Sequence, residues 1–513
     1  MAEIKYNDDR AISFLCPFDQ EESIMDQCFI GIDLGTSAVK LLLMDDTGRI
    51  VKTVSRGYPL SFPQPGWSEQ DPDDWFTQSI DGLKELISGC EQAVRGISFG
   101  GQMHGLVVLD DEDRVIRPAI LWNDGRTGEE CEYLNGTIGK DVISAETGNI
   151  AFAGFTAPKL LWMRKHEPEN FERIEKIMLP KDYLIYKLSG VHATDASDAS
   201  GMLLYDVKNR KWSEKMCELC GIREEQLAEV YESYEAVGEI LPSIADELGI
   251  RKDVLIIAGA GDNAAAAIGT GTIADGDCNI SLGTSGTIFI AADDFSVDEA
   301  NALHSFAHAS GRYHLMGCML SAASCNKWWM EDILRDEDMA SAQKEIGDLG
   351  KNHIYFLPYL MGERSPHNDP LARAAFVGMS MDSTRGEMLQ AVFEGVAFGL
   401  RDSLEVARAA GLNITKTKIC GGGAKSPLWR RIIANVMNLT VETVEAEEGP
   451  AMGGAMLAAV GCGVWKDVKE AAAAVVRVSG TEEPDAELVK LYEERYRTFR
   501  KIYPALKGIY PEV

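Results

Sequence analysis

The chain has 513 residues, which is enough for two to four domains of ordinary size. It carries 50 Lys and Arg against 80 Asp and Glu, a formal net charge of −30. This excess argues against general binding to nucleic acid or to an anionic membrane, because both need a basic face. Phosphate binding remains compatible with it, since backbone N–H groups hold phosphates without basic side chains.

The cysteine content and the first residues indicate the compartment. Eleven cysteines are too few for a disulfide scaffold, and Met1 to Arg10 carry charges instead of the apolar stretch of a signal peptide. No run of about 18 uninterrupted apolar residues occurs. We therefore expect a cytoplasmic chain with reduced thiols and no membrane partner. Cys217 and Cys220 have no second pair at zinc-binding spacing, so we interpret them as ordinary helix cysteines.

Along the chain, apolar runs alternate with helical patterns. Residues 1–28 are polar and without a period, and we interpret them as an N-terminal extension. Strands are then predicted over 29–34, 39–44, 49–58 and 94–99, with a helix over 74–90 between the last two. Strands interleaved with helices indicate an α/β layer architecture.

A repeated motif indicates that the core is duplicated. Leu-Gly-Thr-Ser occurs at 34–37 and again at 282–285, each time between two predicted strands and before an acidic turn. Internal repeats of this kind are typical of duplication. We predict two similar domains that face each other across an active-site cleft, with a boundary near Ile273 to Asp277. The division is 29–275, then 276–500, with 501–513 as a C-terminal tail.

Each Gly-Thr-Ser turn places hydroxyls and N–H groups at a hairpin tip, which is suited to cradling phosphate. One copy from each half could clamp a polyphosphate from both sides. The residues concerned are Thr36 and Ser37 in the first turn and Gly283, Thr284 and Ser285 in the second. Asp33 precedes the first turn, and a carboxylate beside phosphate is unfavourable without a cation. It is therefore either a Mg²⁺-linked residue or a turn-capping aspartate.

Two further glycine-rich segments follow predicted strands. Asp262 is flanked by glycine on one side and by Asn263 and four alanines on the other. It is either a catalytic acid at the carboxyl end of a strand or an ordinary helix N-cap. The three glycines 421–423 let backbone approach a ligand closely, although their spacing is not that of a Walker P-loop.

Aromatic and histidine side chains provide weaker signals. His104 lies in a glycine-rich loop after the strand 94–99, where a ligand has access. Trp122 is either a platform for a sugar ring or a core tryptophan, with the core as the default interpretation. His304 and His308 could meet on one helix face, but they lack the glutamate of a metalloprotease motif, so we interpret them as structural.

Together these segments resemble the FGGY carbohydrate kinases, which have the two-domain sugar-kinase/Hsp70/actin (ribonuclease H-like) fold. The resemblance spans about residues 29–500 and is strongest to the xylulokinase branch. Glycerol kinases carry an Arg-Glu pair where this chain has Met103-His104. The motifs that carry it, in family order, are Gly31–Ser37, Ser98–Gly105, Ile120–Arg126, Gly261–Ala265, Ser281–Gly286, Leu357–Asn368 and Gly421–Ala424.

The resemblance implies phosphorylation of D-xylulose to D-xylulose 5-phosphate by Mg²⁺-ATP, with Asp262 as the general base that takes the proton of the 5-hydroxyl. It implies sugar contacts from Met103, His104 and Asn263, to which we add Trp122 and Asp262 itself. It also places Asp33 near Mg²⁺, the two Gly-Thr-Ser turns at the phosphates, Gly422, Gly423 and Ala424 on the adenosine side, and Trp328 or Trp329 near adenine.

The chain departs from the family pattern in two places and leaves alternatives open. Arg431 and Asn435 stand where the family often has Gln and Asp, and residues 1–28 exceed the usual start. Alternative functions are a kinase for another pentulose, polyol or sugar acid, such as ribulose or gluconate, and a non-catalytic actin-like nucleotide switch. The Met103-His104 loop argues against the switch. We expect no nucleic-acid partner, and a homodimer is a candidate assembly.

Overall fold

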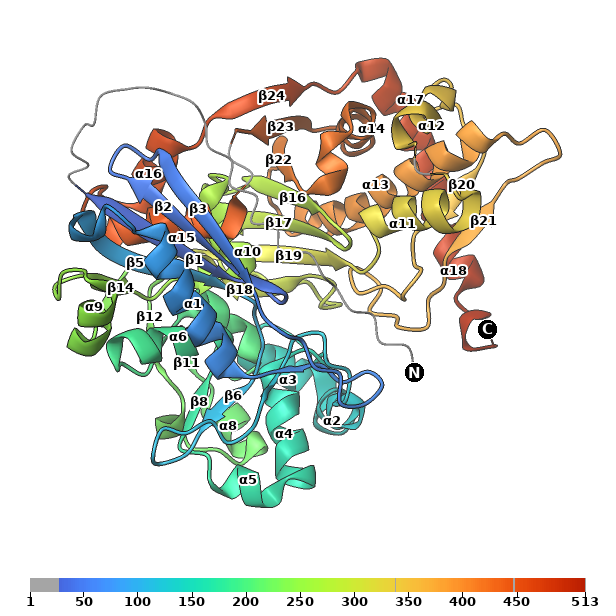
Figure 1. Cartoon of the computed structure of the whole chain (residues 1–513). Coiled ribbons are helices and arrows are strands. Elements are labelled where there is room, and N and C mark those ends of the chain that lie inside the picture. The colour runs from blue at the N-terminus through green and yellow to red at the C-terminus, as the bar shows by residue number, and fades with distance from the viewer. Residues whose placement is uncertain (1–26, 337, 446–447, 513) are drawn as a thin grey trace.

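The computed structural model describes residues 27–336, 338–445 and 448–512. Two mixed sheets of seven strands each form the centre of its two halves (Figure 1). The first sheet holds β1 (Cys28–Leu34), β2 (Ala38–Asp45), β3 (Ile50–Gly57), β5 (Val94–Gly101), β13 (Ala236–Glu239), β14 (Leu255–Ile257) and β15 (Ala260–Gly261). The second holds β16 (Cys278–Leu282), β17 (Gly286–Ala292), β18 (His304–Ala307), β19 (Tyr313–Met319), β22 (Lys416–Cys420), β23 (Thr440–Val444) and β24 (Val478–Glu482).

The two sheets share the order and direction of five of their strands. In the first, β1, β2 and β3 form an antiparallel meander, and β1 runs parallel to β5, which runs parallel to β14. In the second, β16, β17 and β19 form the meander, and β16 runs parallel to β22, which runs parallel to β23. An antiparallel strand, β13 or β24, closes each series. The duplication predicted from the repeated motif is thus confirmed.

The first elements form where the pattern predicts them. Strands β1, β2 and β3 cover the three predicted apolar runs, with the Leu-Gly-Thr-Ser turn between the first two. Helix α1 (Pro72–Leu86) begins two residues earlier than predicted, because the Asp71 side chain caps it by accepting the N–H of Asp73. The helix also ends before Cys90, and the chain then passes through Gly89 at φ +90°.

Between β5 and β13 the chain builds an extra lobe, which is the lower cyan-to-green part of Figure 1. It contains α2 (Gly128–Glu132), α3 (Lys140–Thr147), α4 (Thr156–His166), α7 (Ala196–Ala199) and α8 (Glu214–Cys220). Its apolar core includes Phe306 and Met316 from β18 and β19 of the second half. The amide side chain of Asn149 donates to Ser305 O (2.9 Å) and accepts the Ser305 N–H (3.2 Å), so the lobe is joined to the second sheet.

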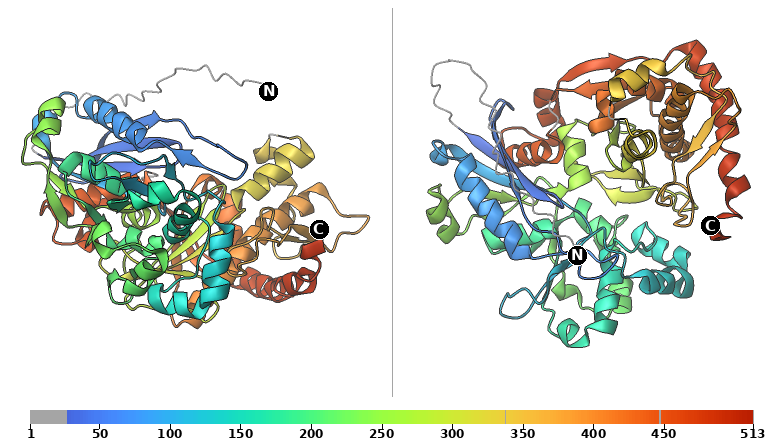
Figure 2. Two further views of the ribbon diagram at one scale, coloured as in Figure 1. Left: turned by 90° about the horizontal axis from the view of Figure 1, so that it is seen from below. Right: turned by 45° about the vertical axis from the view of Figure 1, so that its right-hand side comes forward.

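Helix α15 (Gly449–Gly461) returns from the second half and packs on the first sheet and on α10 (Asp262–Gly269). Figure 2 gives two further views of the whole ribbon, coloured along the chain. The approach is so close that a Cβ built on Gly31 would lie 1.8 Å from the carbonyl oxygen of Ala451. One built on Gly453 would lie 1.8 Å from that of Ala265. Helix α15 therefore packs against the first sheet although it follows most of the second half in the sequence, so no single point in the sequence separates the two packed halves.

The residues after 500, predicted as a tail, fold onto the second half. They form α18 (Ile502–Leu506) and a 3₁₀ turn (Tyr510–Glu512). Tyr503 and Tyr510 are part of the hydrophobic core of the second half. The Tyr503 ring stacks on His367 with centroids 3.8 Å apart, and its hydroxyl donates to Asp369 (2.7 Å). The predicted N-terminal extension lies outside the described residues, apart from its last two.

Cys217 and Cys220 both lie in α8, as buried free thiols, which confirms their interpretation as helix cysteines. Within the described ranges no helix is long and apolar enough to cross a membrane. Nor does that part of the chain contain a group of three or more His, Cys, Asp or Glu arranged to hold a metal ion.

We predict that Gly31→Ala destabilises the protein. The added methyl group would collide with the backbone of α15, which cannot rotate away, so we expect a loss of at least about 1–3 kcal/mol and a fall of several degrees in the thermal midpoint. Gly128→Ala is the control, because Gly128 begins α2 with no neighbour within 4 Å of its Cβ position. Equal midpoints for Gly31→Ala and wild type, by calorimetry, would contradict this account.

Candidate active site

Asp262 lies at the junction of β15 and α10. Gly261 is the N-cap of this helix and Asp262 is its first residue. The carboxylate accepts the backbone N–H of Asn263 (2.7 Å) and the side-chain amide of Asn263 (3.0 Å). Among the described residues it accepts neither the N–H of Ala264 nor that of Ala265, which a capping aspartate at this position would bind. The alternative that Asp262 serves only as the helix cap does not fit this geometry.

Asp33 lies close to Asp262 because β1 and the junction of β15 with α10 flank the same strand, β5. In the sheet, Asp33 of β1 and Ala260 of β15 both pair with Gly100 of β5, on opposite sides. Burial raises the pKa of Asp262 to about 6. Burial, and then the charge of Asp262, raises the pKa of Asp33 to about 7. Two partly buried carboxyl groups thus repel each other at the end of the first sheet.

These carboxylates fit a magnesium site that is completed by a ligand. Mg²⁺ is commonly held by one or two carboxylates together with substrate phosphates and water, so a cluster of three protein ligands is not required. The mutual repulsion of Asp33 and Asp262 is what a cation would relieve. Lys40, which is nearby, is already paired with Glu448 at the start of α15.

The loop after β5 places His104 in a strained conformation. Its φ is +69°, a left-handed conformation that is uncommon outside glycine. Nδ1 lies 2.8 Å from the carbonyl oxygen of Gly201, while the His104 carbonyl accepts bonds from Thr156 Oγ1 (3.1 Å) and Lys159 Nζ (2.8 Å). Burial lowers the pKa of the imidazole to about 3, so the ring is neutral. With Nδ1 donating to Gly201, Nε2 is free to accept from a hydroxyl group.

The structure brings the other predicted sugar contacts to the same place. The side-chain nitrogen of Asn263 lies 3.9 Å from the Met103 sulfur. A Cβ on Gly261 would lie within about 3 Å of the Met103 side chain, so that glycine admits it. Met103, His104, Asp262 and Asn263 therefore meet between β5, β15 and α10.

Sequence reasoning missed the residues that hold this arrangement. Lys159 is fully buried and, besides His104, donates to Gly154 O (2.7 Å); burial lowers its pKa to about 7. Ser197 Oγ accepts the N–H of Gly261 (3.2 Å) and donates to Asp195 (2.5 Å), whose other oxygen is 2.9 Å from Lys181 Nζ. The mostly polar run Thr194–Asp198, which overlaps the short strand β9 (Ala193–Asp195), was a usable signal for the group around Ser197 and Asp195.

Trp122 is not a core residue, which corrects the default interpretation. Its side chain is 44% exposed, and Nε1 donates to Thr36 Oγ1 (2.9 Å). Thr36 Oγ1 in turn donates to Gln102 Oε1 (3.2 Å), and Gln70 Nε2 donates to Thr36 O (2.7 Å). The tryptophan therefore lies beside the first hairpin tip, where Ser37 is exposed.

The second hairpin tip lies next to the glycine loop. Thr284 and Ser285 are exposed, and the carbonyl of Thr284 accepts the Ser324 hydroxyl (2.7 Å). Gly421 has φ +91°, and a Cβ there would lie 2.8 Å from the backbone of Leu282. The short 3₁₀ turn Gly422–Lys425, which contains Gly423 and Ala424, follows directly. The phosphate and adenosine residues predicted for the second half, Gly283 included, are thus neighbours.

The structure also locates the histidine, tryptophan and asparagine residues for which the sequence provides weaker signals. His304 lies on β18 and His308 just after it, so they do not share a helix face; both are buried. Trp329 is buried against Phe376 and Trp328 stacks on Phe356, and their proximity to adenine stays a prediction. Asn435 accepts the N–H of Asp485 (2.7 Å), which ties α14 (Pro427–Met437) to the start of α17 (Ala486–Phe499).

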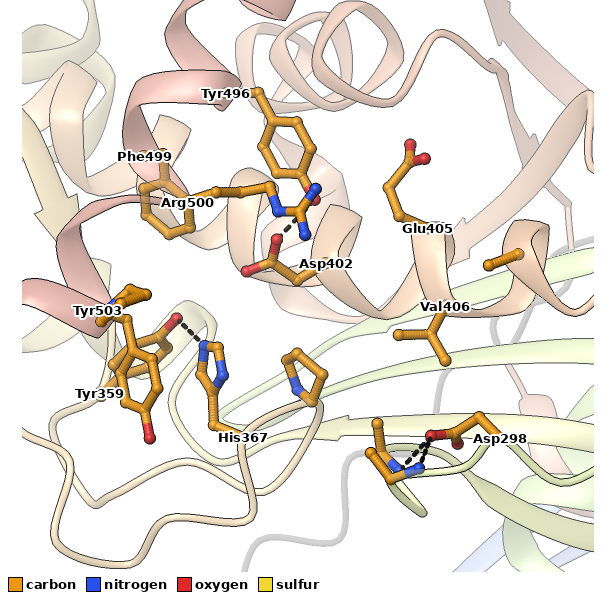
Figure 3. A pocket seen from close by; sticks show the side chains of 15 residues that line it. Asp298, Tyr359, His367, Asp402, Glu405, Val406, Tyr496, Phe499, Arg500 and Tyr503 are labelled. Carbon is orange, nitrogen blue, oxygen red and sulfur yellow. Dashed lines mark hydrogen bonds between the residues drawn. The ribbon is translucent and has the colours of Figure 1, made fainter. Parts of the chain in front are cut away.

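A cavity of about 620 Å³ lies elsewhere, in the second half (Figure 3). Its walls come from α13 (Arg385–Ala409), α17, α18 and the loops around Asp298 and His367. The polar groups that line it bond to one another: Tyr496 donates to Asp402 (2.5 Å), and the Tyr359 hydroxyl lies 3.0 Å from His367 Nε2. None of the predicted site residues lines this cavity.

Residues 28–269 match the N-terminal domain, and residues 278–462 the C-terminal domain, of the FGGY family of carbohydrate kinases. The chain belongs to this family. It is 39% identical to a xylulose kinase of Escherichia coli (strain K12) over 93% of this chain and 99% of that protein.

Solved structures of family members are similar throughout. The chain is 38% identical to a crystal structure titled a xyloylose kinase from Brucella ovis, which it matches with a TM-score of 0.90 over 94% of this chain and all of that one. It also matches a gluconate kinase from Lactobacillus acidophilus, with 27% identity and a TM-score of 0.91 over 95% of this chain and 99% of that one. The two-domain sugar-kinase fold predicted from the sequence is confirmed.

Asp262→Asn tests the general-base role of this residue. The amide keeps the shape and can still bind a sugar hydroxyl, but it cannot accept a proton. We expect kcat to fall by about 10²–10⁴-fold, with sugar affinity measured by calorimetry nearly unchanged. A variant that keeps more than about a tenth of wild-type kcat would exclude the general-base role, because Asn and Asp cap helices equally well.

The pH dependence follows from the raised pKa of Asp262. A general base acts when deprotonated. At saturating Mg²⁺-ATP, where the cation would keep Asp33 ionised despite its raised pKa, kcat/KM for the sugar should therefore be constant above about pH 6 and fall about tenfold per unit below it. His104 should add no inflection near pH 6.5, since its ring stays neutral. Initial rates between pH 5 and 8, with circular dichroism to confirm folding at each pH, measure this. A flat profile would contradict it.

Proposed function

We propose that this chain phosphorylates D-xylulose at its 5-hydroxyl with Mg²⁺-ATP. The observation that carries the proposal is the convergence of Asp262, Asn263, Met103 and a neutral His104 at one point, with Asp33 and the first hairpin tip beside it. The likeness to a xylulose kinase over nearly the whole of both chains supports the choice of sugar.

In this proposal each group has a chemical task. Asp262 accepts the proton of the 5-hydroxyl as the oxygen of that hydroxyl attacks the γ-phosphorus. The bond from this phosphorus to the β,γ-bridging oxygen breaks, and ADP leaves. His104 Nε2 accepts from another hydroxyl, and the Met103 side chain packs against the carbon chain. The Thr36-Ser37 and Thr284-Ser285 tips hold the phosphates through N–H and hydroxyl groups. Catalysis of phosphoryl transfer is mainly positioning and charge stabilisation, so fixed donors suit it.

Asp33 would hold the magnesium ion, with Asp262 close by. The ion would neutralise charge on the phosphate oxygens when it is bound with ATP. The loop from Gly422 to Ala424 would contact the adenosine end, because it adjoins the second hairpin. Phosphate groups held by backbone N–H donors explain how a chain with a net charge of −30 binds a nucleotide.

A panel of acceptors tests the proposal. With Mg²⁺-ATP, we expect D-xylulose to give the highest kcat/KM among D-xylulose, D-ribulose, glycerol and D-gluconate, measured as ADP release and confirmed by mass of the product. Replacing Mg²⁺ with EDTA should abolish turnover. A higher kcat/KM on gluconate or ribulose would reassign the sugar, and ATP hydrolysis without transfer to any acceptor would favour the nucleotide-switch alternative.

A further inference from the structure

A cation from the second half lies next to the sugar-contact residues of the first. Arg364 lies in the loop that follows β20 (Tyr355–Leu357), within the Leu357–Asn368 motif. Its side chain is partly buried.

The backbone on both sides of Arg364 is fixed to the end of β19. The Glu363 carboxyl accepts the N–H groups of Leu320 (3.1 Å) and of Arg364 itself (2.8 Å). Ser365 N–H donates to Cys318 O (2.9 Å), and Ser365 Oγ accepts the Cys318 N–H (3.0 Å). Bonds on both flanks set the point from which the arginine side chain extends.

The guanidinium lies among aromatic and sulfur groups that adjoin His104. Its carbon is 4.9 Å from the centroid of the Phe152 ring. That ring is 5.5 Å from Phe155, which is itself 4.6 Å from His104. Burial raises the pKa of the Cys318 thiol, and the Arg364 guanidinium, which hydrogen-bonds the sulfur, opposes the rise.

No carboxylate balances this cation within the described ranges, where Arg364 forms no ion pair with Asp or Glu. Glu363 does not supply the charge, because burial raises its pKa to about 8 and leaves it mostly protonated at neutral pH. A guanidinium has five N–H donors, and a thiol and the face of a ring leave most of them without an oxygen acceptor. A partly desolvated cation of this kind favours oxygen-rich ligands.

The guanidinium belongs to the His104 side of the site. Its charge contributes, after burial, to lowering the pKa values of His104 and His304. Asp262 also acts on Cys318, the thiol that the guanidinium bonds, so Arg364 and Asp262 both lie near Cys318. A sugar whose reacting hydroxyl faces Asp262 can therefore reach Arg364 with its other end.

The chemistry of a ketopentose identifies that other end. A five-carbon 2-ketose closes a five-membered ring only through its 5-hydroxyl, which is the acceptor in the proposed reaction. The molecule must therefore react in its open-chain form, with a free carbonyl at C2 and a hydroxyl at C1. Two adjacent oxygens match the parallel N–H donors of a guanidinium.

We propose that Arg364 completes the sugar pocket from the second half of the chain, donating to the C2 carbonyl and C1 hydroxyl oxygens of an open-chain ketose. This role rests on the proposed function. It makes Arg364 a specificity-determining residue that distinguishes a ketose from the corresponding polyol, and it requires both halves to be in place before the sugar is fully bound.

Arg364→Gln and Arg364→Lys test the assignment, with Arg373→Gln as a control that removes an exposed arginine from the same loop. We would measure calorimetric affinities for D-xylulose and for xylitol, its reduced polyol, together with steady-state kinetics and thermal midpoints. For Arg364→Gln we expect affinity and kcat/KM for D-xylulose to fall about 10- to 100-fold, as for a lost bond to a charged group. Xylitol affinity should fall by a smaller factor, because xylitol shares the C1 hydroxyl but has no C2 carbonyl. Lysine should restore part of the loss, and KM for ATP and the thermal midpoint should stay as in Arg373→Gln.

Three results would overturn the assignment. The first is an equal loss for D-xylulose and xylitol, and the second is an unchanged D-xylulose affinity in a folded Arg364→Gln protein. The third is an Arg364-dependent preference of the wild type for D-gluconate, which would show that the guanidinium binds a carboxylate. If the wild type does not phosphorylate D-xylulose at all, the proposed function fails with it. A normal wild type beside an unaffected variant refutes only the role of Arg364.

Discussion

The site depends on the close contact of α15 with the first sheet and with α10. Gly31 and Gly453 allow backbone to touch backbone at this crossing, where any side chain would separate the elements. The contact brings residues from the end of the chain beside β1, and it sets the position of α10, whose first residue is Asp262. Gly100 of β5 has the same function, because its lack of a side chain leaves room for Pro450 of α15 and Ala265 of α10. Small residues at these positions bury less apolar surface than larger ones would, but they let the helices and strands approach each other closely.

The electrostatics of the site follow from that proximity. Asp33 and Asp262 are both partly buried and near each other, so each would be more stable if it were neutral. Such an arrangement is unfavourable for folding and useful for a reaction that needs a base and a cation-binding group. Behind it, Lys181 is surrounded by Asp182, Asp195 and Asp198, all fully buried, and through Ser197 this group supports the backbone before Asp262. Rigid support of this kind keeps the carboxylate in place without consuming its hydrogen-bonding capacity.

Each half of the molecule supplies one side of the site. In the proposed site the first half holds the acid pair, His104 and the first hairpin, while the second would supply the other hairpin, the glycine loop and Arg364. The extra lobe and β18 form one continuous apolar core, so the halves are already joined near His104. Any relative movement of the two sheets must therefore pivot near this junction and near the crossing of α15 with α10. This constraint links sugar binding to the relative placement of the two halves.

The sequence by itself determined the strands and hairpins, the duplicated core, the family and the position of Asp262. These features are encoded locally, in apolar runs, glycine turns and short motifs. Such local patterns can be recognised without knowing which distant residues are in contact. Only the tertiary structure decided that Trp122 is exposed beside Thr36, that His304 lies on a strand, and that Asn435 ties two helices together. It also decided that Lys159 is buried on the His104 carbonyl and that Arg364 lies near the same histidine. These contacts depend on which distant segments pack together, and the residues adjacent in the sequence do not indicate that.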